Sequence, residues 1–140
     1  MSLNSIELEL LRNSYKVLSR DVETHSREFY EALFRHAPHL RALFREDLAG
    51  QGMKFMTTLG MIVDNLDQDD KNVEKYAELG ELHATIGVKR SHFEPMREAL
   101  IDTLRMVLGE EFTPTLEAAW REAFDQVSAS MIQRGKIKEG

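Results

Sequence analysis

The chain has 140 residues, with 18 lysines and arginines against 24 aspartates and glutamates, which gives a formal net charge of −6. This length is typical of one domain, so we expect residues 1–140 to form a single domain. The acidic balance argues against nucleic-acid binding, which needs a basic face. The absence of cysteine excludes disulfides, cysteine-ligated metals and thiol nucleophiles. No signal-peptide pattern and no run of 18 apolar residues is visible, so we expect no membrane span and a cytoplasmic location.

Apolar residues recur at helical spacing through most of the chain. This pattern predicts helices near residues 4–19, 21–36, 37–43, 50–66, 72–86, 91–108 and 114–134. Ser91 and Glu94 are spaced as a capping box, Gly109 is placed to end a helix, and Thr113 precedes a proline at a first helical position, Pro114. No strand alternation and no repeat is visible. The sequence therefore predicts an all-α domain of about seven helices, although a helix bundle with extra helices would show the same periodicity.

One histidine differs from the other four. We expect surface or capping roles for the histidines beside charged residues or helix ends: His25, His36, His39 and His92. His83 instead shares an apolar stripe with Tyr76 and Gly80, and the glycine would leave space beside the imidazole. A core histidine bonded to a backbone carbonyl is one interpretation. The other is a metal ligand. A lone histidine cannot hold zinc, whereas the iron of a porphyrin needs only one protein ligand on one side.

Two further polar residues lie on predominantly apolar helix faces. Tyr30 carries a phenol O–H and Gln51 an amide N–H, and they belong to different predicted helices. Each also has an ordinary interpretation, because a phenol can reach solvent and a glutamine can sit at a helix start. If the two groups converge in an apolar pocket, they suit a small ligand that gains negative charge when it binds.

Several segments of the chain share a known pattern. They are Phe29-Tyr30-x-x-Leu33-Phe34 with Pro38 and Leu43-Phe44, then Gln51-Gly-x-Lys54-Phe55-Met56, then His83 placed 32 residues beyond Gln51, and finally Leu108-Gly109-Glu-x-Phe112-Thr-Pro114 with Ala119-Trp120-x-x-Ala123-Phe124. Together these segments resemble the globin family, and most closely the single-domain bacterial globins related to flavohaemoglobins. The resemblance covers nearly the whole chain.

The resemblance implies a globin fold around a pocket for haem b (iron protoporphyrin IX). It implies that His83 is the proximal ligand of a five-coordinate iron, with its other ring N–H donated to a carbonyl near Leu79. Tyr30 and Gln51 would donate hydrogen bonds to a gas ligand on the distal side, beside Phe55. Phe44 would stack on the porphyrin and Lys54 would pair with a propionate, unless this lysine is simply solvated. The remaining residues implied to contact haem are Phe34, Leu59, Leu79, Val88, Phe93, Met96 and Leu100.

By this resemblance the protein binds dioxygen, nitric oxide or carbon monoxide reversibly as a monomer or homodimer, and serves as an oxygen carrier, store or scavenger. One alternative is a nitric oxide dioxygenase that takes electrons from an external reductase. Another is a gas- or haem-sensing module that acts through a partner. The chain departs from flavohaemoglobins at two positions, because Phe93 stands where they have tyrosine and Gly135 where they have glutamate. The resemblance therefore implies no carboxylate that pushes electron density through His83, which argues against peroxidase-like chemistry and against highly efficient nitric oxide dioxygenation.

Overall fold

The computed structural model describes residues 3–43, 48–64, 66, 76–81, 83, 88–135 and 137, apart from the side chains of 48–51 and 53. Within these ranges the chain forms helices and turns, and no strand. The α-helices are α1 (Ser5–Leu18), α2 (Val22–His36), α3 (Leu48–Asp64), α5 (Phe93–Leu108) and α6 (Pro114–Arg134). Residues 76–81 and 83 are also helical. Short 3-10 turns connect them: η1 (Ser19–Asp21), η2 (Pro38–Leu43), η3 (Arg90–His92) and η4 (Gly109–Glu111). The all-α prediction is confirmed.

The start of α6 follows from local chemistry that the sequence displays. The Thr113 hydroxyl accepts a hydrogen bond from the Leu116 N–H at 3.2 Å, and Pro114 occupies the first turn, where its missing N–H has no cost. Gly109 ends α5 with φ of +58°, a conformation that favours glycine. Both predicted boundaries are therefore confirmed.

The predicted capping box of Ser91 and Glu94 is wrong. The helical turn that leads into α5 begins earlier, at Arg90, and Glu94 already lies inside the helix. The backbone N–H of Lys89 donates to Nδ1 of His92 at 3.1 Å. Because the 3-10 turn η3 moves the free N–H groups to Lys89, the histidine three residues later satisfies the donor that a serine cap would have served.

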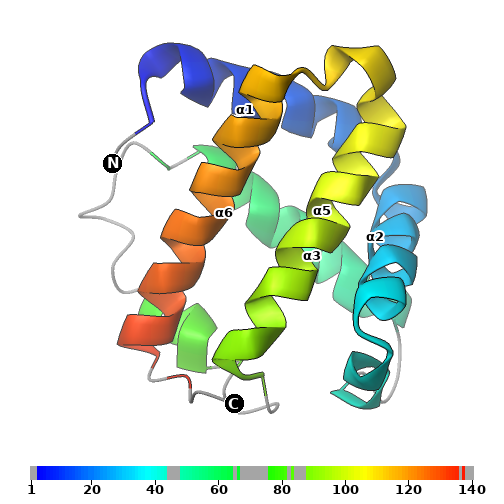
Figure 1. Cartoon of the computed structure of the whole chain (residues 1–140), viewed down its shortest axis with the longest axis vertical. Helices are drawn as coiled ribbons and strands as arrows, with labels where there is room; N and C mark the ends of the chain where they lie inside the picture. Colours follow the sequence, from blue (N-terminus) through cyan, green and yellow to red (C-terminus); the bar gives the residue numbers. More distant parts are fainter. Residues whose placement is uncertain are drawn as a thin grey trace.

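The helices α5 and α6 run antiparallel side by side, with α3 behind them and α1 across one end (Figure 1). Helix α2 packs against both α3 and α5. The core centres on Trp120 of α6, which is 1% exposed. Its indole N–H donates to the Ser14 hydroxyl at 2.9 Å, and that hydroxyl donates in turn to the Leu11 carbonyl. A buried hydrogen-bonded relay thus fixes α6 to α1.

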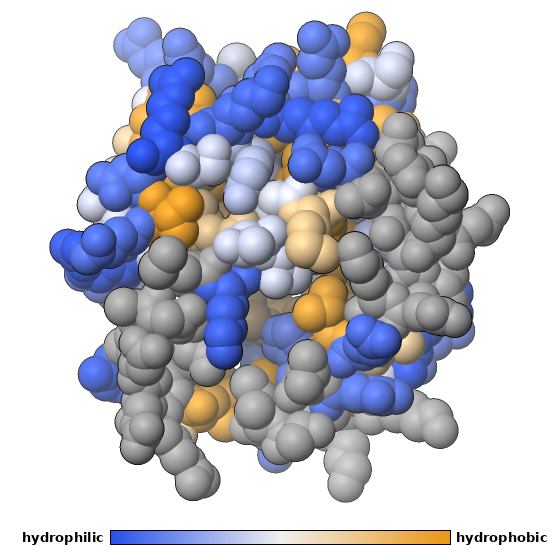
Figure 2. Space-filling view, turned by 180° about the vertical axis from the view of Figure 1, so that it is seen from behind, coloured by the Kyte–Doolittle hydropathy of each residue, from blue (hydrophilic) through white to orange (hydrophobic). Residues whose placement is uncertain are grey.

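On the face seen from behind the view of Figure 1, apolar and weakly polar side chains gather in the centre between strongly hydrophilic ones (Figure 2). None of the described helices is both long enough and apolar enough to cross a membrane. The buried core side chains lie between the helices, and the candidate site is a space left between them.

Candidate functional site

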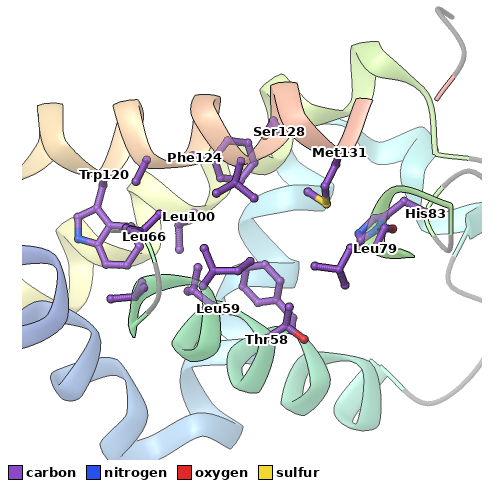
Figure 3. A pocket seen from close by; sticks show the side chains of 15 residues that line it. Thr58, Leu59, Leu66, Leu79, His83, Leu100, Trp120, Phe124, Ser128 and Met131 are labelled. Atoms are coloured by element: carbon purple, nitrogen blue, oxygen red, sulfur yellow. The ribbon is translucent and has the colours of Figure 1, made fainter. Parts of the chain in front are cut away.

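A cavity of about 90 Å³ lies between α3, the helical residues 76–81 and 83, α5 and α6. In Figure 3, His83 and Leu79 stand at one end and Trp120 and Leu66 at the other, with Leu59 between them. Among the described residues that line it, His83 is the one titratable side chain. The walls are mostly apolar, as those of small-molecule and cofactor sites usually are.

The imidazole of His83 is held in one orientation. Its Nδ1 lies 2.6 Å from the carbonyl oxygen of Leu79, one helical turn earlier. A carbonyl can only accept, so Nδ1 carries the proton and Nε2 keeps its lone pair. The backbone is fixed as well, because the Val88 N–H donates to the His83 carbonyl at 2.9 Å. The predicted hydrogen bond to Leu79 is confirmed, and it leaves one ring nitrogen free for a ligand-binding role.

Helix α6 supplies the wall opposite α3. Its lining residues follow helical spacing along one face, and they are Trp120, Ala123, Phe124, Val127, Ser128 and Met131. None of these six residues was among the predicted site residues. Their spacing was a visible signal, but an apolar stripe on a helix indicates burial without showing which cavity it faces.

Tyr30 lies in a second hollow, which opens beside α2. Ser26, Phe34 and Arg41 also line that hollow. The Tyr30 ring packs against the start of α3, because a Cβ built on Gly52 would lie 3.3 Å from Tyr30 Cε2 and 2.6 Å from the Ser26 Cβ. Burial raises the pKa of Tyr30 to about 12. Its phenol is therefore protonated at neutral pH and can donate a hydrogen bond.

An aromatic row joins this hollow to the cavity of His83. Phe55, which lines the cavity, stacks on Phe29 at 4.3 Å between ring centroids. Phe29 meets Tyr30 edge-to-face at 5.2 Å, and Tyr30 meets Phe34 at 6.1 Å. Phe29 lies between the two sites. The described lining residues place Tyr30 and His83 in different hollows, connected through these rings.

The metal-ligating side chains of the described residues fit the cofactor that the sequence implies. The described residues contain no cluster of three or more histidine, aspartate or glutamate side chains that could hold a bare metal ion. They offer one oriented imidazole in an apolar cavity. This chemistry fits a metal that brings its own equatorial nitrogens, as haem iron does.

Comparison with known proteins identifies the family. Residues 27–131 match the globin family. The chain is a globin. An anaerobic nitrite reductase of Arabidopsis thaliana is 26% identical to this globin over 145 residues, which span 93% of this chain and 92% of the relative. The flavohemoprotein of Bacillus subtilis (strain 168) is 23% identical over 133 residues, which span 93% of this chain and 33% of that longer protein.

The fold has a solved counterpart. The crystal structure of a hexacoordinated heme protein from an anhydrobiotic tardigrade aligns with this globin at a TM-score of 0.85. The alignment covers 96% of both chains at 21% sequence identity. The predicted globin fold is therefore confirmed, and the family makes this chain a haem-binding globin.

The other predicted haem contacts lie in different parts of the structure. The cavity brings four of them together with His83: Phe55, Leu59, Leu79 and Leu100. Four more are absent from its described lining, and one of them, Phe34, lies in the hollow of Tyr30 instead. Val88 and Phe93 are buried and Met96 is half-buried, and the Phe93 ring lies 6.2 Å from the His83 ring. Lys54 is exposed. Phe44 and the side chain of Gln51 lie outside the described residues, so their predicted contacts stay predictions.

Gly80 has a different role from the predicted one. The sequence suggested that it leaves space beside the imidazole, but the backbone of α6 fills that space. A Cβ built on Gly80 would collide with the Met131 carbonyl oxygen and would lie 2.8 Å from Gly135 Cα. Glycine is required here because α6 docks on this turn. The same contact explains the departure at Gly135, where a glutamate would have to displace the Gly80 backbone.

The remaining histidines have the predicted surface and capping roles. His25 Nδ1 lies 2.6 Å from a carboxylate oxygen of Glu28 on the same helix, and His36 Nε2 lies 2.7 Å from a carboxylate oxygen of Asp102 on α5. His92 accepts at the turn that leads into α5, and His39 is exposed.

Proposed function

We propose that this globin binds dioxygen, and other diatomic gases such as nitric oxide and carbon monoxide, at the five-coordinate iron of haem b. The observation that carries the proposal is His83, whose imidazole is fixed by Leu79 in an otherwise apolar cavity. We propose that the protein works in the cytoplasm as an oxygen carrier, store or scavenger, as a monomer or homodimer. The haem supplies the iron and four ligand nitrogens.

On the proximal side, the chain's residues set the position and charge of the ligand. The Leu79 carbonyl holds the proton on Nδ1, which fixes the tautomer and the angle of the ring. Phe93 packs beside the imidazole. Neither Phe93 nor Gly135 carries an ionisable side chain, so His83 acts as a neutral imidazole without a carboxylate partner at these two positions.

On the distal side, Tyr30 and Gln51 would donate hydrogen bonds to the gas ligand. A Cβ built on Gly52 would lie 3.3 Å from the Tyr30 ring; this part of α3 therefore lies beside Tyr30, and Gln51 precedes Gly52 in the chain, which supports the proposal. Dioxygen gains partial negative charge when it binds, and a hydrogen bond to a charged group contributes about 1.5–3 kcal/mol. Every 1.4 kcal/mol changes an affinity about tenfold. Tyr30 would therefore slow dioxygen release by about one to two orders of magnitude.

The test is the dioxygen dissociation rate of Tyr30→Phe. We expect it to rise about 10-fold or more, measured by stopped-flow displacement with carbon monoxide. Tyr15→Phe is the matched control, because the Tyr15 hydroxyl donates to the Met56 carbonyl at 2.6 Å and so has a structural partner. A change within about twofold in Tyr30→Phe would contradict the distal role of Tyr30. Lack of a Soret band after expression with added haem would contradict the proposal as a whole.

A second candidate is redox chemistry on nitrogen oxides. The Arabidopsis relative is named an anaerobic nitrite reductase, and it aligns over nearly its full length. The resemblance to flavohaemoglobins makes nitric oxide dioxygenation, with electrons from an external reductase, the other enzyme activity to consider. Mixing the ferrous protein with nitrite in the absence of oxygen would measure nitrite reduction. Mixing the oxygenated protein with nitric oxide would measure nitric oxide dioxygenation. Repeated turnover with a reductase would favour an enzyme, and a single turnover would favour a gas carrier or a sensor that acts through a partner.

A further inference from the structure

The turn that carries His83 approaches α6 closely through backbone atoms. A Cβ built on Gly80 would collide with the Met131 carbonyl oxygen, and one built on Gly135 would collide with the Gly80 backbone. These obstacles are main-chain atoms, not the ends of flexible side chains. Any side chain at either position therefore forces the two segments apart. We call this backbone contact between Gly80 and Gly135 the glycine contact.

The glycines are needed for space and not for an unusual backbone conformation. Among the described glycines, only Gly109 has a positive φ. Gly135 has φ of −86° and ψ of −3°, which alanine also adopts readily. An alanine at this position would therefore act through the contact it makes with Gly80, and not through strain in its own backbone.

The contact is close to His83 in the chain, and on the α6 side it belongs to a hydrogen-bonded turn. Gly80 precedes His83 by three residues, and residues three apart on a helix lie on nearly the same face. On the other side, the Gly135 N–H donates to the Met131 carbonyl at 2.9 Å, which closes the last turn of α6. Met131 also lines the cavity. A shift at the glycine contact is thus expected to move the ring of His83, three residues further along the chain.

We propose that the glycine contact positions His83, by setting how far its imidazole reaches into the cavity. Gly80 and Gly135 are positioning residues in this proposal, which rests on the proposed role of His83 as the iron ligand. A side chain at either position moves the turn away from α6 and withdraws the imidazole from the iron. The strength of the iron–histidine bond is then set by the docking of the last helix as well as by the Leu79 carbonyl.

The test measures the iron–histidine stretching band of the haem-loaded ferrous protein by resonance Raman spectroscopy. We expect Gly80→Ala and Gly135→Ala to shift the band to lower frequency. Gly109→Ala is the control, because its residue has φ of +58° and nothing within 4 Å of a built Cβ. It should lower the melting temperature through backbone strain and leave the band in place. An unshifted band in both variants, or an equal shift in the control, would overturn the proposal.

A second background separates this inference from the role of His83 itself. His83→Gly with added imidazole replaces the tethered ligand by a free one. In this background Gly80→Ala should no longer shift the iron–imidazole band, because the free ring does not follow the helix; a persisting shift would overturn the positioning role. If His83→Gly alone keeps the wild-type band without imidazole, the proposed ligand is wrong, which is a separate result. Should Gly80→Ala fail to fold, as judged by circular dichroism, Gly135→Ala carries the same test.

Discussion

Ser128 gives a prediction of unusual sign, because its replacement by alanine should stabilise the protein. The side chain is 6% exposed and lines the apolar cavity, and within the described structure its hydroxyl oxygen has no hydrogen-bond partner. Burying a hydroxyl without a partner costs about 1–3 kcal/mol in protein mutational data. Alanine removes this cost and adds about 0.5 kcal/mol of helix propensity. We therefore expect Ser128→Ala to raise the free energy of unfolding by about 1.5–3.5 kcal/mol.

Ser130→Ala is the matched control, since Ser130 is half-buried on the same helix and is absent from the described lining of the cavity. It should gain the propensity term alone, about 0.5 kcal/mol. Urea unfolding followed by circular dichroism would compare the two variants at equal protein and haem concentrations, because cofactor binding shifts the transition. If Ser128→Ala gains no more than the control, or is destabilised, the Ser128 hydroxyl has a partner and the reasoning is refuted.

Three other outcomes follow from the described contacts. Ser14→Ala leaves the Trp120 indole N–H buried without an acceptor and should lower the free energy of unfolding in urea by about 1–3 kcal/mol. Ser19→Ala is the control and should change it little, because Ser19 is exposed and its hydroxyl donates only to a carbonyl of its own turn. Hydrogen bonds from Arg121 on α6 lower the pKa of Glu98 to about 2. The stabilisation by the Glu98 carboxylate is full above its unfolded-state pKa of about 4.3 and is lost as the pH falls toward 2. Glu98→Gln should therefore flatten the fall of the melting temperature between these pH values. Absorbance titration should show a tyrosine with a pKa near 12 that Tyr30→Phe removes.

Much of the fold follows from signals that are local in the chain. The helical period predicted the described helices, and Thr113, Pro114 and Gly109 marked boundaries because their chemistry acts within one turn. The hydrogen bond between His83 and Leu79 also spans one turn, so a family pattern could predict it. Even so, the capping box at Ser91 failed, because a neighbouring 3-10 turn moved the start of the helix.

What the sequence could not predict depends on how distant segments dock. The stripe of α6 was visible, but its position opposite α3 depends on packing between residues far apart in the chain. Gly80 and Gly135 are separated by 55 positions, and each alone gives no sign that their backbones touch. Likewise, the apolar face of its helix predicted that the Tyr30 phenol lies on a buried side. That Tyr30 lines a different hollow from His83 depends on how α2 packs against the start of α3 at Gly52.

The wall that α6 supplies has a consequence for the order in which the protein is made. Synthesis proceeds from the N-terminus, so α1, α2, α3 and His83 leave the ribosome before the residues of α6 that face them across the cavity. Until Trp120 through Met131 have emerged, the cavity lacks its far wall, and the turn that carries His83 lacks the backbone against which it docks. Stable capture of the cofactor must therefore follow translation of this last helix. A nascent chain arrested within α6 should bind haem weakly and retain it briefly.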